Sequence, residues 1–389
     1  MIFLKRKEDC CGCTACLQVC PKKCIAFKED EAGFCYPYVD TTVCVKCGLC
    51  VKVCPMLKTE DANYPKEVYA LKCQNEFIRS ESSSGGAFTL LAESVLEDNG
   101  VVFGARFDAD WTVIHDYVET KEGLKYFRGA KYMQSKLYGA YIRAELFLKE
   151  GRRVMFTGTP CQIAGLKKYL KREYDNLLTV DFICHGVPSS KVWNLYLSNE
   201  LKKQSKDCSI DSISFRAKDT GWHNYSVRLT TVDSKGAKFY SHNIFFQNDY
   251  MRLFLSDLIL RPSCYNCLSK SGRSGADITL GDFWGVEKKY PEFDDDRGIS
   301  LVMVNRDKSI CDIMKHRDVA FKPIPLKEAI ECNKSYFSSP RKPISPVIYK
   351  VLTFCGFDLF MKFIFPIYHL VNKIVTRCHK SEDAIEVIN

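Results

Sequence analysis

Two copies of one cysteine pattern lie near the start of the chain, and thiolates at this spacing bind iron–sulfur clusters. Each copy reads C-x2-C-x2-C-x3-C-P, and each cysteine of the second copy follows its counterpart by 34 residues. The eight residues are Cys10, Cys13, Cys16, Cys20, Cys44, Cys47, Cys50 and Cys54. This is the spacing of bacterial-type 4Fe–4S proteins. The duplication therefore predicts a small two-cluster unit that moves electrons.

The fourth cysteine of each copy is expected to serve the other copy's cluster. It precedes a proline, and in two-cluster ferredoxins the cysteine at this position ligates the neighbouring cluster. The expected ligand sets are Cys10, Cys13, Cys16 with Cys54, and Cys44, Cys47, Cys50 with Cys20. A unit of fewer than about 60 residues buries little surface, so the metal would supply much of its folding energy.

Zinc and disulfides suit these cysteines less well than clusters do. Zinc takes paired C-x2-C units and four ligands, so a third regularly spaced cysteine does not fit it. Disulfides need an oxidising compartment, and the segment Met1–Lys7 lacks the long apolar run of a secretory signal. We therefore expect a cytoplasmic iron–sulfur protein. Cys11 and Cys24 lie outside the repeat, and we interpret them as small apolar residues without a ligand role.

The basic charge of the chain does not indicate a nucleic-acid partner. The formal net charge is +9 when thiols are counted as neutral. Each 4Fe–4S core with four thiolates adds roughly −2, so three clusters would lower the net charge to about +3. The sequence also lacks zinc-finger and RNA-binding aromatic signatures, and we expect no nucleic-acid partner.

After the N-terminal unit, predicted strands end in loops that carry polar residues. A strand is predicted over Val68–Lys72, and the glycine-rich loop Ser82–Gly86 precedes a predicted helix over Ala87–Glu97 with a serine N-cap. A further strand is predicted over Val101–Ala105. Free amides at such a loop can bind an anion, but glycine-rich turns before helices are also common without a ligand.

Four more cysteines fall at loop ends. Cys161 follows a predicted strand at 152–156 and starts a helix, Cys184 ends a strand at 177–184, and Cys264 and Cys267 form a C-x2-C unit in a loop. Two more strands are predicted at 276–284 and 299–305. A helix N-terminus lowers a thiol pKa, which suits a ligand or a nucleophile. The spacing alone leaves open a metal site, a redox pair or no site.

Several stretches of the chain match one known protein family. They are Ser83–Gly86, Phe127–Tyr132, Phe156–Gln162, Cys184–Pro188, the pair Cys264 and Cys267, and Ala276–Asp282. On these stretches the chain resembles the beta-subunit family of coenzyme F420 hydrogenases and dehydrogenases, which are iron–sulfur flavoproteins and include plant-type hydroxymethyl-chlorophyll reductases. The match covers residues 1 to about 310, and the tail after about 340 lies outside it.

The resemblance implies a third 4Fe–4S cluster, a bound FAD and hydride exchange with a substrate such as a reduced deazaflavin coenzyme. The third cluster would use Cys161, Cys184, Cys264 and Cys267. The FAD cradle would comprise Ser83, Ser84, Gly85, Gly86, Arg128, Lys131, Tyr132, Ser135, Thr157, Gly158 and Thr159. The two clusters fused at the N-terminus imply a self-contained relay, whereas the substrate is not fixed by family membership.

The predicted function is an oxidoreductase that links one-electron and two-electron chemistry. A flavin takes two electrons as a hydride, and a 4Fe–4S cluster takes one at a time. Electrons would pass between a partner such as ferredoxin, docked on Lys22, Lys23, Lys46 and Lys52, and a small-molecule substrate. The alternatives are a non-catalytic electron-transfer subunit or carrier, and a structural or regulatory iron–sulfur protein.

No catalytic residue is identifiable from the sequence, although several side chains are candidates for contact with the flavin or substrate. Asp282 and Trp284 are candidates for the flavin face, with core or turn roles as alternatives. Segments 215–218 and 221–223 are candidates for substrate contacts. Three histidines, His115, His185 and His223, are candidate proton donors, though a structural role is the commoner fate of a histidine.

The expected fold class is α+β, with a small two-cluster ferredoxin-like domain followed by a larger mixed α/β flavin-binding domain. The expected divisions are the ferredoxin-like unit at 1–58, a linker at 59–66, the two parts of the larger domain at 67–150 and 151–340, and a helical tail at 341–389. Charged residues and Pro366 interrupt the apolar tail, so we expect helices packed on the body. The alternative is a membrane-surface or partner-docking helix, and the tail is the only part of the chain that offers membrane contact.

Overall fold

The N-terminal unit repeats its backbone as it repeats its cysteines. The structure, a computed structural model, describes residues 1–204, 207–306, 318–343 and 348–371. Helices α1 (Ala15–Gln18) and α2 (Leu49–Lys52) each begin after a residue in the left-handed region, Thr14 at φ 59° and Gly48 at φ 77°. The 34-residue offset of the cysteines thus also relates the two helical turns.

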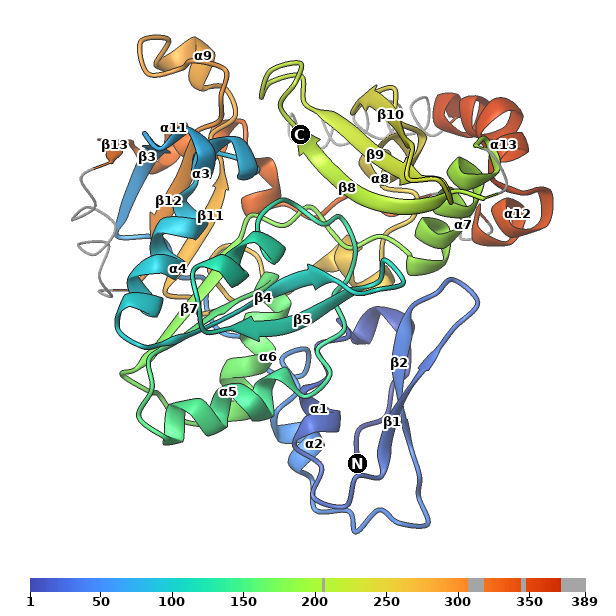
Figure 1. The fold of residues 1–389 in the computed structure, drawn as a ribbon. Coiled ribbons are helices and arrows are strands. Elements are labelled where there is room, and N and C mark those ends of the chain that lie inside the picture. The colour runs from blue at the N-terminus through green and yellow to red at the C-terminus, as the bar shows by residue number, and fades with distance from the viewer. Residues whose placement is uncertain (205–206, 307–317, 344–347, 372–389) are drawn as a thin grey trace, which may run out of the picture.

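Two strands complete this unit, β1 (Ile25–Glu29) and β2 (Cys35–Val39), which pair antiparallel with Ile25 opposite Val39. A 3-10 turn, η1 (Lys7–Asp9), precedes the first cysteine. In Figure 1 the unit is the blue lobe, and its helix α1 lies against α5 and α6 of the larger domain. Its interior is largely made of cysteine, with Ile2, Cys16, Cys24, Ile25 and Cys50 buried together.

The larger domain is built on a mixed eight-stranded sheet in the order β13-β3-β12-β11-β7-β6-β4-β5. The four central strands β11, β7, β6 and β4 run parallel, and the outer pairs are antiparallel. The strands are β3 (Glu67–Cys73), β4 (Val101–Phe107), β5 (Val113–Val118), β6 (Val154–Thr157), β7 (Leu177–Phe182), β11 (Ile278–Asp282), β12 (Ser300–Val304) and β13 (Val319–Pro323).

Helices cover both faces of the central strands, as expected for parallel strands that are apolar on both sides. Along β6 the side chains alternate, so that Met155 joins α4 on one face while Val154 and Phe156 join α5 and α6 on the other. The helices of this domain are α3 (Glu76–Glu81), α4 (Ala87–Glu97), α5 (Ala140–Lys149), α6 (Pro160–Leu170), α9 (Val286–Lys289) and α11 (Leu326–Glu331), with 3-10 turns η2 (Glu122–Tyr126), η3 (Pro262–Asn266) and η4 (Lys334–Tyr336).

A three-stranded antiparallel sheet, β10-β9-β8, stands beside the large sheet (Figure 1). Its strands are β8 (Ser209–Ala217), β9 (Ser226–Val232) and β10 (Lys238–Ile244), and its helices are α7 (Ser190–Lys202) and α8 (Asp249–Leu255). Part of the tail packs here as α12 (Ile348–Cys355), α13 (Phe357–Leu359) and the π-helical turn η5 (Phe360–Ile364). Phe357 and Phe360 share a core with Trp193 and Tyr250.

The expected fold class is confirmed, because a small ferredoxin-like unit precedes a larger domain with a mixed sheet. The helix predicted over Ala87–Glu97 has these bounds, but its N-cap is Gly86 at φ 94° rather than a serine. Only glycine adopts this conformation freely.

No helix within the described ranges is both long and apolar enough to cross a membrane. Residues 372–389 of the expected tail lie outside the described residues.

Candidate metal centres and flavin site

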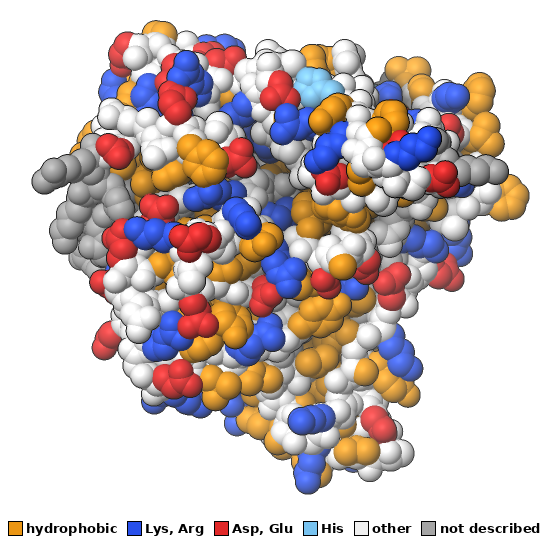
Figure 2. Space-filling model, in the orientation of Figure 1, with side chains coloured by type: hydrophobic (Ala, Val, Ile, Leu, Met, Phe, Trp, Pro, Cys, Tyr) orange, Lys and Arg blue, Asp and Glu red, His pale blue; other side chains and the backbone are white. Residues whose placement is uncertain are grey.

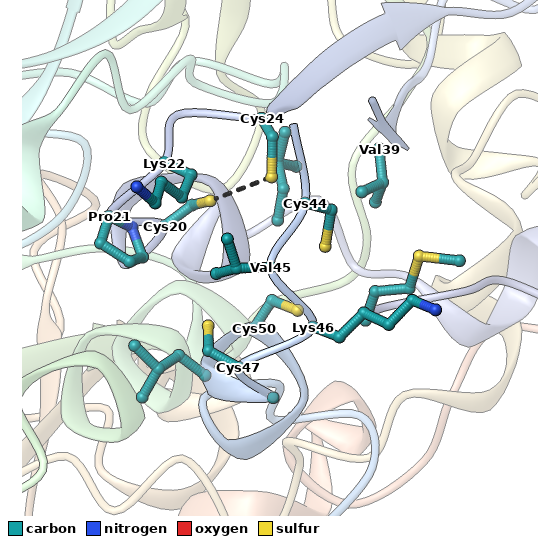
Figure 3. A pocket seen from close by; sticks show the side chains of 14 residues that line it. Cys20, Pro21, Lys22, Cys24, Val39, Cys44, Val45, Lys46, Cys47 and Cys50 are labelled. Carbon is teal, nitrogen blue, oxygen red and sulfur yellow. Dashed lines mark hydrogen bonds between the residues drawn. The ribbon is translucent and has the colours of Figure 1, made fainter. Parts of the chain in front are cut away.

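One cavity of the N-terminal unit is lined by Cys24 and by four predicted ligands, which we call the outer site: Cys20, Cys44, Cys47 and Cys50. Three come from the second copy of the pattern and one from the first, as cross-ligation requires. Figure 3 shows their sulfur atoms around a common space, with Cys24 beside Cys20 at 3.4 Å between sulfurs. Cys47 is exposed, and Lys22 and Lys46 lie on the cavity wall. The outer site therefore lies near solvent, in the N-terminal unit that forms the lower lobe of Figure 2.

The other set, Cys10, Cys13, Cys16 and Cys54, is called the inner site. Burial and the neighbouring Cys10 and Cys54 thiols raise the pKa of Cys16 to about 12. Burial and the nearby Cys10 thiol also raise the pKa of Cys54. These mutual effects place Cys54 of the second copy among the cysteines of the first, which is the arrangement predicted from the spacing.

A second cavity, between the N-terminal unit and the larger domain, is lined by the other four predicted cysteines. These are Cys161, Cys184, Cys264 and Cys267, which we call the third site. Cys161 is the second residue of α6, Cys184 follows β7 by two residues, and the C-x2-C pair spans the end of η3. The chain therefore brings together residues more than 100 positions apart.

A fifth thiol also lines the third-site cavity. Cys11 belongs to the N-terminal unit, is 5% exposed and shares a buried cluster against which Cys161 packs. The adjacent Cys11 thiol, together with burial, raises the pKa of Cys161 well above its usual value. The interpretation of Cys11 as a small apolar residue without a ligand role stays a prediction, and the structure places this residue beside a predicted ligand, Cys161.

The chemistry of the donors at the third site fits a 4Fe–4S cluster. Burial, with the Cys161 and Cys267 thiols close by, raises the pKa of Cys264 to about 12. Such crowded, buried thiolates need a cationic core, which a cluster supplies. The backbone N–H of Val187 points to Cys264 Sγ at 3.4 Å, a contact that stabilises a ligating thiolate.

In the part of the chain that the structure describes, no three His, Cys, Asp or Glu side chains converge on a single metal ion. A cubane has a different requirement, because each of its four irons takes one protein ligand. The thiols therefore need to surround a volume rather than meet at a point. The cavities at the outer and third sites, each lined by four predicted ligands, satisfy that requirement.

A buried arginine joins the inner and third sites. Arg261 is 1% exposed and precedes Cys264 by three residues. Its Nε donates to the carbonyl oxygen of Cys10 at 2.8 Å, and its Nη2 donates to the carbonyl oxygen of Cys35 at 2.9 Å. The Tyr36 ring lies 4.5 Å from its guanidinium. Sequence reasoning missed this residue, because a single arginine before a C-x2-C pair forms no pattern.

The predicted loop Ser83–Gly86 makes most of its hydrogen bonds inside the protein. Ser84 Oγ donates to the carbonyl oxygen of Ile299 at 2.6 Å, and the Gly85 N–H donates to Ser300 Oγ at 2.9 Å. A Cβ on Gly85 would lie 2.2 Å from the carbonyl oxygen of Leu71. The Ser84 hydroxyl and the Gly85 N–H therefore hold the loop against the rest of the domain through hydrogen bonds, and Gly85 packs closely on β3, so these groups are used inside the protein.

Side chains from distant segments gather instead around Arg216. Its guanidinium donates to Asp282 at 3.0 Å, to Tyr132 Oη at 3.4 Å and to the Ser83 carbonyl at 3.3 Å, and it lies 5.0 Å from the Trp284 ring. Trp284 stacks on Trp222 with ring centroids 4.8 Å apart. Among the described residues, Arg216 Nε and Trp222 Nε1 are buried without a hydrogen-bond partner. Buried donors are rarely left without a partner, and a hydrogen bond from a bound ligand group is one way to satisfy them.

The basic residues among the predicted flavin and substrate contacts are hydrogen-bonded within the protein, the two lysines to carbonyl oxygens and Arg128 to a hydroxyl. Lys218 Nζ donates to the carbonyls of Arg79 and Ser84, at 2.7 and 2.8 Å, and burial beside Arg79 and Arg216 lowers its pKa to about 7. Lys131 Nζ donates to the carbonyls of residues 127, 128 and 129, and burial lowers its pKa to about 7. Arg128 Nε donates to Thr89 Oγ1 at 3.2 Å.

The remaining predicted flavin residues lie next to Cys161. Thr159 Oγ1 is 3.2 Å from Cys161 Sγ, and the Thr159 N–H donates to Gln162 Oε1 at 2.9 Å. Gln162 Nε2 donates to Ser135 Oγ at 2.9 Å, and Thr157 Oγ1 donates to the carbonyl oxygen of Phe103 at 2.9 Å. A Cβ on Gly158 would lie 3.1 Å from the Gln162 amide. This segment therefore adjoins the third site.

The three histidines have different environments. His115 is 2% exposed, with Nε2 2.7 Å from the Thr157 carbonyl and Nδ1 2.7 Å from Ser135 Oγ, and burial lowers its pKa to about 4. A carbonyl only accepts, so Nε2 carries the proton and the ring is neutral. His185 Nε2 lies 2.6 Å from Asp257 and its ring lines the third-site cavity. His223 Nε2 lies 2.8 Å from Asp294.

Comparisons with known proteins match both parts of the chain. Residues 151–323 match the family described as the C terminus of the coenzyme F420 hydrogenase/dehydrogenase beta subunit, and residues 37–56 match a 4Fe–4S binding domain. The resemblance inferred from the motifs is thereby confirmed.

Curated relatives are similar over part of their length. An uncharacterized protein of Methanocaldococcus jannaschii is 24% identical over 43% of this chain and 54% of its own length. A coenzyme F420-dependent sulfite reductase of the same organism is 29% identical over 41% of this chain and 25% of its own length. A 7Fe ferredoxin of Hydrogenibacillus schlegelii is 41% identical over 13% of this chain and 59% of its own length.

One solved structure, the F420-reducing NiFe hydrogenase complex from Methanosarcina barkeri, contains a chain that aligns with 72% of this chain and 90% of its own. The identity is 18% and the TM-score 0.45. The chain thus spans about half the length of the first relative and a quarter of the second.

Proposed function

We propose that this chain, whose residues 151–323 match the C terminus of the coenzyme F420 hydrogenase/dehydrogenase beta subunit and whose residues 37–56 match a 4Fe–4S binding domain, is an iron–sulfur flavoprotein oxidoreductase. It would pass electrons between a one-electron partner such as ferredoxin and a two-electron substrate or a deazaflavin-type coenzyme. When bound, FAD exchanges electron pairs and each 4Fe–4S cluster exchanges single electrons.

The observation that carries this proposal is the position of the third-site cavity. Cys161, Cys184, Cys264 and Cys267 of the larger domain line it, and so do Cys11 and Met56 of the N-terminal unit. Three thiolate sites therefore follow one another from the exposed Cys47 to the interior of the protein. A structural cluster would not need two further clusters in such a series.

The protein residues would have three roles: to ligate the clusters, to place a positive charge beside one of them, and to attract the redox partner. The cysteines of the outer, inner and third sites would hold clusters, and Arg261 would keep a positive charge beside Cys10. The exposed Lys22 and Lys46 at the outer site would attract an acidic ferredoxin. The other two expected lysines, Lys23 and Lys52, are exposed as well and lie on the same unit.

A flavin would be held between two groups of the predicted residues. The segment Thr157–Thr159 adjoins Cys161, while Ser83 and Tyr132 surround Arg216 together with Asp282. The buried, unpartnered Nε of Arg216 is a donor that a flavin or substrate oxygen would satisfy. The internal hydrogen bonds of Ser84 and Gly85 give those two residues a supporting role in the loop.

Anaerobic purification and turnover test this function. The expected protein is yellow-brown, carries flavin and clusters, and transfers electrons from reduced ferredoxin to an oxidised deazaflavin coenzyme or in the reverse direction. Protein with clusters but no flavin would contradict the proposal. Protein with clusters and flavin that exchanges electrons with ferredoxin but turns over no two-electron acceptor would support the alternative of an electron-transfer subunit.

A further inference from the structure

Cys11 faces a different cavity from the cysteine that precedes it. Cys10 belongs to the inner site, whereas the side chain of Cys11 lines the third-site cavity beside Cys161. The backbone is fixed here, because the carbonyl oxygen of Cys11 accepts from Gln134 Nε2 at 2.8 Å and that of Cys10 accepts from Arg261 at 2.8 Å. Cys11 is thus the cysteine of the N-terminal unit that lines the third-site cavity.

The internal repeat provides a comparison for this position. The residue 34 positions after Cys11 is Val45, which is 57% exposed and lies on the wall of the outer-site cavity. The cluster-binding loop therefore does not need a thiol at this place for its own fold. The difference between the two copies coincides with the presence of the third-site cavity next to the first copy.

We propose that Cys11 is a fifth ligand-competent thiol of the third site, interchangeable with Cys161 at one corner of the cluster held there. This inference rests on the third cluster of the proposed function. A 4Fe–4S cluster takes four protein ligands, and the cavity is lined by five thiols. Cys11 and Cys161 lie on the same side, because Cys161 packs against the buried cluster that contains Cys11.

The exchange is redox-neutral. The bond between one iron and Cys161 sulfur breaks, a bond between that iron and Cys11 sulfur forms, and the thiol proton of Cys11 passes to Cys161. No external oxidant or reductant is required. With Cys11 bound, two consecutive residues would ligate two different clusters, so that the peptide between Cys10 and Cys11 would join the inner site to the third site covalently.

Iron and sulfide counts of four anaerobically purified full-length variants test this exchange. The variants are Cys11→Ala, Cys161→Ala, the double variant Cys11→Ala/Cys161→Ala, and Cys184→Ala as the matched control. The control loses a corner that Cys11 does not reach, because Cys11 lies on the Cys161 side of the cavity. Each single variant at 11 or 161 should keep about 12 irons per chain, whereas the double variant and the control should fall to about eight.

Several outcomes would overturn the proposal. A fall to about eight irons in Cys161→Ala, or a three-iron signal in the EPR spectrum of that oxidised variant, would mean that Cys11 cannot replace it. A fall in Cys11→Ala alone would make Cys11 obligatory and not interchangeable. A wild-type protein with about eight irons would remove the third cluster and both proposals together. Circular dichroism and gel filtration would verify that each variant folds.

Discussion

Arg261 and Cys10 are linked by two contacts across the junction of the two domains. Arg261 Nε donates to the Cys10 carbonyl oxygen at 2.8 Å, and Nη2 lies 3.7 Å from the Cys10 sulfur. The arginine is 1% exposed. The hydrogen-bond acceptors described for its guanidinium are two carbonyl oxygens, the side-chain oxygen of Gln134 and the Cys10 sulfur, and none of them is a carboxylate. Its charge is therefore balanced by thiolates and carbonyl oxygens.

Replacing Arg261 with methionine should lower the reduction potential of the inner cluster. Reduction adds negative charge, and a buried cation stabilises that state by on the order of 1–2 kcal/mol, roughly 40–90 mV for a one-electron couple. EPR-monitored redox titration of Arg261→Met measures the change. Arg261→Lys keeps the charge and should shift the potential less, and equal shifts in both variants would point to lost packing.

Gly165 provides a steric test of the junction. It lies one turn after Cys161 on α6, and a Cβ there would be 2.8 Å from Cys13 Cβ and 3.0 Å from Cys13 Sγ. In an isolated helix Gly→Ala is favourable by about 1 kcal/mol. Here we expect Gly165→Ala to destabilise the protein by about 1–3 kcal/mol, since no space exists for the methyl group.

Thermal unfolding of Gly165→Ala measures this effect under anaerobic conditions. The control is Leu146→Ala on the neighbouring helix α5, where the side chain is 53% exposed and should matter little. A Gly165→Ala protein with a raised unfolding temperature would show that α6 does not contact the inner site so closely.

The buried, neutral His115 should make the free energy of unfolding decrease as the pH falls. Its folded pKa of about 4 lies below the ordinary 6.5, so the folded protein resists a proton that the unfolded chain binds. The stability is complete above pH 6.5 and is lost as the pH falls towards 4, by on the order of 3 kcal/mol in total. His115→Gln removes the titrating group, and denaturant titrations at pH 7 and 5 should give a smaller loss for the variant than for the wild type.

Charge reversal at the outer site should slow docking of an acidic ferredoxin. The double variant Lys22→Glu/Lys46→Glu should lower the association rate by about tenfold or more at low salt, and the difference should shrink as salt is added. Lys235→Glu, on the exposed β9–β10 turn, is the control. Stopped-flow mixing with reduced ferredoxin measures the rates, and equal effects at both places would argue against docking at the outer site.

The sequence predicted the parts of the fold that carry strong local signals. Apolar periodicity and glycine stops located α4, and continuous apolar runs located β4, β7 and β12. The three-stranded sheet was not predicted, because β8 and β10 are polar along much of their length. Their stability depends on residues such as Trp193 and Phe357, which come from distant parts of the chain.

The site was predictable where chemistry imposes a spacing. Thiolate ligands must converge, so the cysteine repeats indicated the outer and inner sites, and the family motifs indicated the third. Arg261 acts through contacts with residues more than 60 positions away, and no local pattern marks it, whereas Arg216 falls within the segment 215–218 that was a candidate for substrate contacts. Gly165 carries a weak signal, since a glycine inside a helix costs stability unless a neighbour approaches closely.

The most direct test of the account is a count of iron, sulfide and flavin in anaerobically purified wild-type protein. Three clusters and one FAD predict about 12 irons, about 12 sulfides and one flavin per chain. About eight irons with no flavin would contradict the account, because Cys161, Cys184, Cys264 and Cys267 would then line a cavity without holding a cluster.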